Sequence, residues 1–236
     1  MTRDRLFRGF RFPPDVILWA VRWYLQFAVS FRDLELMLAD RGVEVDHVTL
    51  YRWTQRFAPE IEARMRPHLR PCRGPWHVDE TYVRVSGGWR YLYRAVDGTG
   101  QTIDFQLSAR RDVQAARRFF RRMLDRNNTR NPRVVVTDRL RSYRSAIRAM
   151  KRKNELWRFA RHRRGQWLNN WIEQDHRRVK RRIGPMLGFK RFATARRVIA
   201  GVEAMIMLRK GQVPTVPATD MPLQRAFITK LFGVTP

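Results

Sequence analysis

The sequence has little of several features that would point to common protein classes. Its 236 residues include one cysteine, Cys72, which excludes an internal disulfide and any zinc site built from several cysteines, and which fits a reducing cytoplasm. No run approaches the roughly 18 apolar residues that a membrane span needs. The basic N-terminal residues are not followed by the apolar core of a signal peptide. We therefore expect a cytoplasmic protein that makes no contact with membranes.

Motifs for nucleotide-driven or serine-based chemistry are also missing. The sequence contains no Walker loop, no dinucleotide-binding fingerprint and no Gly-x-Ser-x-Gly elbow. ATP use and serine-hydrolase chemistry are therefore not expected.

Acidic residues are scarce beside basic ones. The chain has 49 lysines and arginines against 21 aspartates and glutamates, a net charge of +28. Hydrophobic residues make up 44% of it, which is typical of a folded protein and not of a disordered polycation. Such a charge is typical of a protein that binds nucleic acid. The alternatives are a ribosomal-type basic protein and a membrane-surface binder. The basic residues run through the whole chain, and this favours a nucleic-acid partner.

The first 60 residues predict three helices. Ser30-Phe31-Arg32-Asp33 fits a capping box that opens the second helix, which should stop at Gly42. Asp46 is the expected N-cap of a third helix that ends before Pro59. A helix, a glycine-containing turn and a second helix form the helix-turn-helix pattern. We therefore predict an all-α helix-turn-helix domain at 1–60.

The third helix would be the DNA-reading helix of that domain. Its apolar residues fall on one face, and Thr49, Arg52 and Arg56 fall on the outer one. Base edges could be read from this outer face. The alternative is an ordinary three-helix bundle with a solvated basic side.

The remainder of the chain predicts a linker at 61–74, an α/β domain at 75–212 and a C-terminal tail at 213–236 that can hold one short helix. The linker contains Pro67, Pro71 and Gly74. Expected strands are 76–85, 89–96, 101–108 and 133–138 with a short extended piece at 156–159, and expected helices are 112–126, 142–153, 171–210 with a break around 183–188, and 223–232. This order predicts a mixed sheet flanked by helices.

Two strands of that sheet carry carboxylates. Asp79 and Glu80 lie within the strand at 76–85 and point to opposite faces, and Asp138 ends a strand that contains three valines. A carboxylate inside a strand is disfavoured and needs a reason to be there. One of the first two acids should therefore meet Asp138. An exposed edge strand for Asp79 and a turn role for Asp138 are the alternatives.

A third acid, Glu173, opens the helix predicted from residue 171. It could complete a capping box with Asn170, and that role is compatible with metal binding. Ligands that are all oxygen atoms favour Mg²⁺ or Mn²⁺ over zinc. Two such ions could support an in-line displacement at phosphorus.

Several ordered motifs carry a resemblance to a known family. Trp76-His77-Val78-Asp79-Glu80-Thr81-Tyr82-Val83, Tyr91-Leu92-Tyr93-Arg94-Ala95-Val96-Asp97, Thr137-Asp138 and Asn169-Asn170-Trp171-Ile172-Glu173-Gln174-Asp175-His176 resemble the bacterial DDE transposases of insertion-sequence family six. The resemblance covers nearly the whole chain.

The resemblance implies a ribonuclease H-like catalytic domain with a triad of Asp79, Asp138 and Glu173 that holds two Mg²⁺ ions, for which Mn²⁺ can substitute. It also implies terminal inverted repeats and target DNA as double-stranded partners, replicative transposition through cointegrates, and work at the bacterial nucleoid. Joining two element ends suggests a homodimer or a larger oligomer.

Basic residues that follow Glu173 are expected to contact phosphates. The resemblance implies a DNA contact for Lys180, which lies two helical turns after Glu173. The expected phosphate contacts are Arg177, Lys180, Arg181 and Arg182. A non-catalytic DNA-binding regulator is the competing hypothesis, and the intact acidic trio argues against it.

Overall fold

The computed structural model describes residues 5–126, 132–165 and 170–234. The chain divides into two compact units, one of Met1–Arg70 with Val179–Pro236 and one of Pro71–Arg178. This grouping differs from the predicted boundary at residue 212. Long apolar helices at the two ends of the chain pack on each other, so residues from Val179 onward belong with the N-terminal helices.

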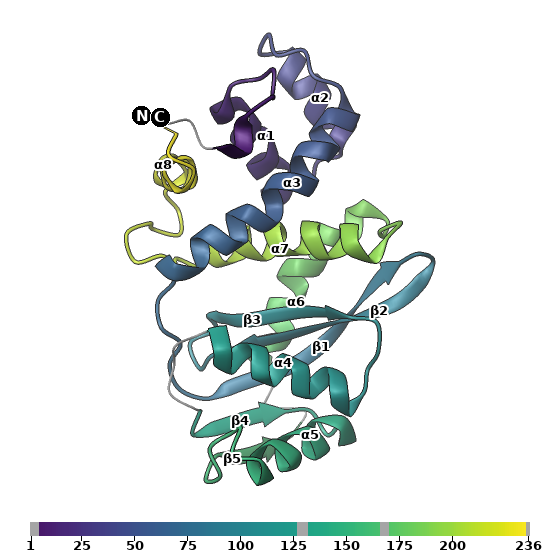
Figure 1. The fold of residues 1–236 in the computed structure, drawn as a ribbon, viewed down its shortest axis with the longest axis vertical. Helices are drawn as coiled ribbons and strands as arrows, with labels where there is room; N and C mark the ends of the chain where they lie inside the picture. The colour runs from purple at the N-terminus through teal and green to yellow at the C-terminus, as the bar shows by residue number, and fades with distance from the viewer. Residues whose placement is uncertain (1–4, 127–131, 166–169, 235–236) are drawn as a thin grey trace. The chain divides into compact units, whose positions relative to one another are not determined.

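The unit of Pro71–Arg178 is built around one mixed sheet (Figure 1). Its strands lie in the order β3-β2-β1-β4-β5. Strands β1, β2 and β3 are antiparallel neighbours, and β4 lies parallel to both β1 and β5. The elements are β1 (Trp76–Val85), β2 (Gly88–Val96), β3 (Thr102–Ser108), α4 (Val113–Arg126), β4 (Val134–Thr137), α5 (Arg141–Arg152), β5 (Arg161–Arg164) and the first part of α6 (Asn170–Ile183). The predicted mixed α/β sheet with flanking helices is confirmed.

The β1–β2 hairpin turns between the two strands that the sequence predicted at 76–85 and 89–96. Ser86 and Gly87 both have positive φ angles, 53° and 74°. Such angles match the right-handed twist of the two strands, and glycine adopts them without strain. The turn fixes the register in which Asp79 lies opposite Arg94.

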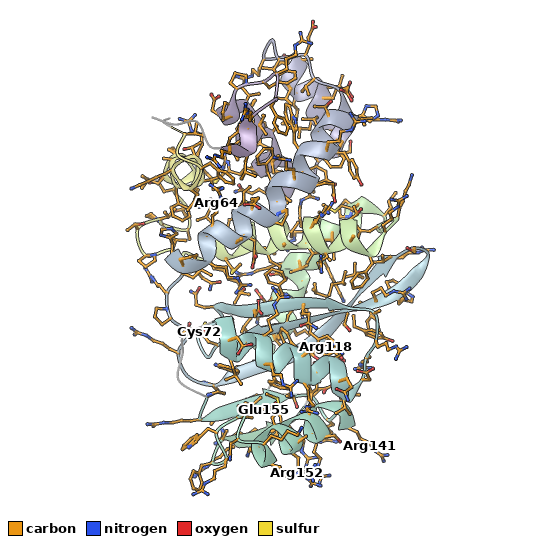
Figure 2. All side chains as sticks on the ribbon, in the orientation of Figure 1. Arg64, Cys72, Arg118, Arg141, Arg152 and Glu155 are labelled. Carbon is orange, nitrogen blue, oxygen red and sulfur yellow. The ribbon has the colours of Figure 1, made fainter. Side chains whose placement is uncertain are left out.

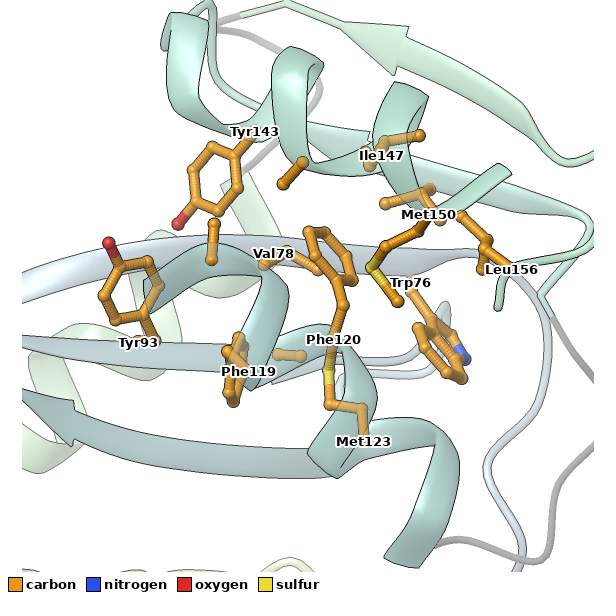
Figure 3. Close-up of a cluster of buried hydrophobic side chains, with 14 of the residues drawn as sticks. Trp76, Val78, Tyr93, Phe119, Phe120, Met123, Tyr143, Ile147, Met150 and Leu156 are labelled. Atoms are coloured by element: carbon orange, nitrogen blue, oxygen red, sulfur yellow. The ribbon is translucent and has the colours of Figure 1, made fainter. Parts of the chain in front are cut away.

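Helices α4 and α5 cover the core on one face of the sheet. Figure 3 shows Phe119, Phe120 and Met123 of α4 in one cluster of buried side chains with Tyr143, Ile147 and Met150 of α5. Helix α4 presents one apolar stripe to this core, in which Ala115, Ala116, Phe119, Phe120 and Met123 are fully buried and Leu124 is partly buried.

The last strand of the sheet lies outside the segment where the sequence predicted it. The extended piece expected at 156–159 was wrong, and β5 is instead the basic segment Arg161–Arg164 beside β4. Leu156 and Ala160 are buried in the core without strand pairing. Apolar content marked the wrong segment, since an edge strand can be charged and its apolar neighbours can pack as a loop.

The other unit is helical. It contains η1 (Arg5–Phe7), α1 (Pro14–Gln26), α2 (Phe31–Ala39), α3 (His47–Met65), η2 (Arg66–His68), the end of α6, η4 (Gly184–Met186), α7 (Phe192–Arg209) and α8 (Met221–Leu231). The Ser30–Asp33 capping box and the Asp46 N-cap are confirmed. Within the described ranges, no helix combines the length and apolar composition needed to cross a membrane.

Helix α3 continues beyond its expected end. The prediction that it stops before Pro59 was wrong, since Pro59 lies inside it. Buried residues on both sides of the proline, among them Phe57, Ile61 and Met65, continue one apolar stripe. The packing of this stripe offsets the cost of the missing backbone hydrogen bond.

Candidate active site

Parallel pairing of β1 with β4 brings the predicted aspartates together. Val78 lies opposite Thr137 in the register, so the next residues, Asp79 and Asp138, fall side by side. Carboxylate oxygens of Asp79, Glu80 and Asp138 all lie within 4.8 Å of one another. The sequence left open which of the first two acids would meet Asp138, and the structure brings both to it.

Glu80 is held by protein partners on the core side of the sheet. Its carboxylate accepts hydrogen bonds from the Tyr143 hydroxyl and from the Arg111 guanidinium. The Glu80 side chain is 1% exposed. Burial raises its pKa, and the bonds from Tyr143 and Arg111 oppose that rise. Glu80 is therefore an anchored, buried carboxylate.

Arg111 and Tyr143 were not identified from the sequence. Arg111 follows β3, and its Nη2 also lies 3.9 Å from Asp138 Oδ2. Two consecutive arginines directly after a strand were the only available signal, and in so basic a chain that signal is weak. Tyr143 gave none, because a tyrosine on the apolar face of a helix is typical of a core residue.

Asp79 lies in an environment that disfavours its charge. Burial and the carboxylates of Glu80 and Asp138 raise the pKa of Asp79 to about 7. The hydrogen bond from the Glu80 backbone N–H and the charge of Arg111 lower the pKa, but by less. Asp138 is more open, with 34% of its side chain exposed. Its Oδ1 accepts a hydrogen bond from the Leu140 backbone N–H at 2.9 Å. The turn role considered for Asp138 is therefore present together with its place in the acidic cluster.

The acidic cluster fits a hard cation. All of its donors are carboxylate oxygens, which Mg²⁺ and Mn²⁺ prefer. Burial and the neighbouring carboxylates raise the pKa of Asp79, and a bound cation would favour the ionised form. With Glu80 already bonded to Tyr143 and Arg111, Asp79 and Asp138 are the two carboxylates best able to bind a metal.

Glu173 lies on α6 and is exposed. Among the described residues it does not belong to the group of carboxylates that lie within 4.8 Å of one another. The predicted capping box of Asn170 and Glu173 lies outside the described residues, because the side chain of Asn170 is not among them.

A buried ion pair fixes the same helix to the sheet. Asp175 Oδ2 lies 2.7 Å from Arg94 Nη2, and the two side chains are 4% and 0% exposed. Arg94 is the cross-strand partner of Asp79. Asp175 therefore ties the first turns of α6, where Glu173 lies, to the strand beside Asp79.

The expected DNA contacts differ in their exposure. Arg52, Arg56, Arg177, Lys180 and Arg181 are exposed. Thr49 is half-buried, and its hydroxyl donates to Asp46 at 2.6 Å, so it takes part in the helix cap. Arg182 was expected to contact a DNA phosphate from the protein surface, but the residue is buried, with only 6% of it exposed. Its guanidinium lies against Tyr24, where packing outweighs the usual exposure of arginine.

Basic side chains also cover the outside of the sheet-containing unit. Figure 2 shows Arg118 on α4 and Arg141 and Arg152 on α5, all of them exposed. The positive charge of the chain is thus spread over both units.

Comparisons with known proteins agree with this site. A family model described as a DDE domain matches residues 74–212. A transposase for insertion sequence element IS257 in transposon Tn4003 of Staphylococcus aureus is 37% identical over 208 residues, covering 86% of this chain and 88% of that protein. A transposase for insertion sequence-like element IS431mec of S. aureus strain Mu50 is 36% identical over the same shares of both chains.

One solved structure is also similar. The intasome of simian T-cell lymphotropic virus in complex with the PP2A regulatory subunit B56 gamma matches with a TM-score of 0.40 and 14% identity over 56% of this chain and 50% of that chain. This likeness is too low to support a conclusion.

The matched DDE domain covers more than half of the chain, and the staphylococcal transposases match it along most of their length. A DDE domain implies the use of divalent metal ions, in agreement with the acidic cluster on β1 and β4. The chain belongs to the DDE transposases of insertion-sequence family six, and as such it is a polynucleotidyl transferase.

Proposed function

We propose that Asp79, Asp138 and Glu173 form the catalytic triad of this transposase and that they hold two Mg²⁺ ions, which Mn²⁺ can replace. The reaction is nicking at the element ends followed by attack of the 3′-hydroxyl on a phosphodiester of target DNA. The observation that carries this proposal is the convergence of Asp79 and Asp138 from neighbouring strands. When bound, the ions would activate the attacking oxygen and stabilise the leaving one.

The third member of the triad is Glu173 and not Glu80. Glu80 is closed in by Tyr143 and Arg111, and a metal would have to displace these partners from a buried carboxylate. Glu173 is exposed on a helix that the Arg94–Asp175 pair ties to the sheet. A metal ion could bind Glu173 without breaking contacts in the core, whereas binding Glu80 would break its hydrogen bonds to Tyr143 and Arg111.

Two isosteric variants distinguish the two glutamates. Glu173→Gln is expected to lower the strand-transfer rate about 100-fold or more, which is about 2.7 kcal/mol of transition-state stabilisation, without changing the thermal midpoint. Glu80→Gln is expected to lower the thermal midpoint, because the buried carboxylate has charged partners, and to slow strand transfer less. The measurements are joined product per minute in Mg²⁺ and thermal unfolding.

Glu44→Gln serves as a matched control, since it removes an exposed glutamate charge from the helical unit. It should change neither quantity. A Glu173→Gln protein that joins DNA at the wild-type rate would remove Glu173 from the triad.

The surrounding fold supports this chemistry. A sheet of order β3-β2-β1-β4-β5 with β4 parallel to β1 is consistent with a ribonuclease H-like domain. Helices α2 and α3, with a capped start to each and Gly42 at a φ of 72° between them, are consistent with a helix-turn-helix. We infer that this pair of helices binds the terminal inverted repeats, that transposition is replicative, and that two or more copies join the ends.

Two arginine variants test whether α3 reads the base sequence while the basic residues of α6 contact only the phosphates. Arg52→Ala, on the outer face of α3, is expected to cost about 1–3 kcal/mol on the terminal repeat and to narrow the affinity gap between that repeat and random duplex. Arg181→Ala, which removes a phosphate contact, should weaken binding to both duplexes alike. Both affinities are measured at one salt concentration, because phosphate contacts make them salt-dependent. An unchanged gap with Arg52→Ala would show that α3 is not the reading helix.

A further inference from the structure

A cavity of about 1030 Å³ lies within the helical unit. Its lining comes from the end of α1, the start of α2 and the start of α3, and from the end of α6, the segment after η4 and the start of α7. A sphere of this volume is about 12 Å across, roughly the width of the B-DNA major groove alone. A space of this size has room for one or two nucleotides of a single strand.

A buried arginine without a full set of partners faces this cavity. Arg182 is 6% exposed, its Nε donates to the Leu25 carbonyl at 3.2 Å, and its guanidinium lies 4.7 Å from the centre of the Tyr24 ring. Its Nη2 has no hydrogen-bond partner within the described ranges. A buried N–H group without an acceptor is costly. Because this atom is covered in the empty cavity, a small turn of the guanidinium would bring its N–H group to an anionic oxygen there.

The charges around the cavity favour an anion. Lys190, Arg191 and Arg197 line it together with Arg182, and all three are exposed. Asp33 is the only acidic residue among the described residues of the lining, and its carboxylate accepts a hydrogen bond from the Ser30 backbone at 2.9 Å. Four cations against one carboxylate give the cavity a positive potential that suits a phosphate.

Aromatic rings form the apolar part of the lining. Tyr24 and Phe31 are stacked with ring centroids 3.8 Å apart, and Phe31 meets Tyr51 edge-on at 5.9 Å. Tyr51 is 39% exposed, so its ring can accept a further flat partner. Nucleobases stack on such rings with little regard to sequence.

We propose that this cavity binds one or two unpaired nucleotides of a DNA strand, with a phosphate at Arg182 and a base on Tyr51. The proposal rests on the proposed reaction, because nicking and joining expose strand ends that can leave the double helix. Enzymes that act on nucleic acid commonly bind nucleotides taken out of the stack. A strand of DNA is favoured over a second, positively charged copy of the chain as the occupant, since the cations of the lining need a negatively charged partner.

The test compares single-stranded with duplex DNA. Fluorescence anisotropy at fixed salt would give Kd values for a labelled thymidine oligonucleotide and for a duplex of equal length. Tyr51→Leu should raise the single-strand Kd about five-fold or more relative to the duplex Kd, because base stacking is lost. Phe27→Leu is the matched control, since Phe27 has the same 39% exposure and lies outside the lining. It should leave both Kd values unchanged.

A second pair of variants, both on α7, tests the contribution of the positive lining to binding of the single strand. Arg197→Gln removes a cation from the lining, and Arg209→Gln removes an exposed cation from the far end of α7. The first should reduce the slope of log affinity against log salt for the single strand by about 1, and the second should leave it unchanged. Both positions are exposed, so folding should survive, and thermal unfolding checks it.

Two results would overturn the proposal. One is an unchanged single-strand Kd in both Tyr51→Leu and Arg197→Gln. The other is a change of oligomeric state in Tyr51→Leu with unchanged DNA binding, which would assign the cavity to a second copy. The catalytic proposal is tested separately by Asp138→Asn. If this variant loses joining while either of the two results above is found, the catalytic proposal stands and only the single-strand proposal is wrong.

Discussion

Asp138→Asn is expected to reduce strand transfer about 1000-fold or more while leaving the fold intact. The substitution removes the charge of one of the two accessible carboxylates, and a metal site supplies several kcal/mol of transition-state stabilisation. About 4 kcal/mol corresponds to that factor. The asparagine oxygen can still accept the hydrogen bond from the Leu140 N–H that Asp138 Oδ1 now accepts at 2.9 Å. The turn after β4 should therefore persist, and only the chemistry should be lost.

The assay measures joining of a terminal-repeat duplex to target DNA in Mg²⁺, with duplex binding and thermal unfolding as controls. Both controls should stay near wild-type values. Asp138→Cys adds a test of direct metal binding, because a thiolate suits softer ions better than Mg²⁺. This variant should be inactive in Mg²⁺ and partly active in Mn²⁺. Substantial joining by Asp138→Asn in Mg²⁺ would remove Asp138 from the catalytic site.

Breaking the buried ion pair between Arg94 and Asp175 is expected to cost about 3–5 kcal/mol of the free energy of unfolding. Each single variant, Arg94→Met or Asp175→Leu, leaves the other charge in a site where the side chains are 0% and 4% exposed. The double variant removes both charges and should be more stable than either single variant. Urea unfolding of the three proteins gives the free energies for comparison.

Arg121→Met provides the exposed counterpart. Arg121 Nη2 lies 2.7 Å from Glu155, but the arginine side chain is 47% exposed, so its loss should cost far less free energy of unfolding than the loss of Arg94. An equally small cost for Arg94→Met would mean that the buried pair does not fix α6. Since Glu173 lies two residues before Asp175, the single variants should also join DNA more slowly even at temperatures where they remain folded.

The sequence alone determined the features that depend on near neighbours. Asp46 and Ser30 cap their helices through backbone groups two or three residues away. The Ser86-Gly87 turn follows from the φ angles available at those two positions. Strand β1 and the buried stripe of α4 follow from apolar periodicity. Each of these signals is contained in a short stretch of chain, so it could be read without knowing the fold.

Convergence of Asp79 with Asp138 could also be predicted, because acids at matching positions of neighbouring strands lie side by side in the sheet. The environment of these acids could not. Arg111 and Tyr143 reach Glu80 from 31 and 63 residues away, and they decide that Glu80 is buried and bonded. Arg122 likewise lies 2.8 Å from the buried Asp104, which is 18 residues away along the chain. Such pairings depend on which helix face meets which strand.

Tertiary structure also decided where the chain divides and which cations are buried. Pro59 is an ordinary helix stop in the sequence, but the apolar contacts on both sides of it carry α3 onward to Met65. Arg182 belongs to a basic run that suggests a solvated surface, and packing against Tyr24 buries it. Helix propensities differ by up to about 0.7 kcal/mol among ordinary residues and by about 3 kcal/mol for proline, whereas burial of a single large apolar side chain contributes about 1.5–3 kcal/mol. Several such contacts together therefore override a local signal, and they form only when distant parts of the chain meet.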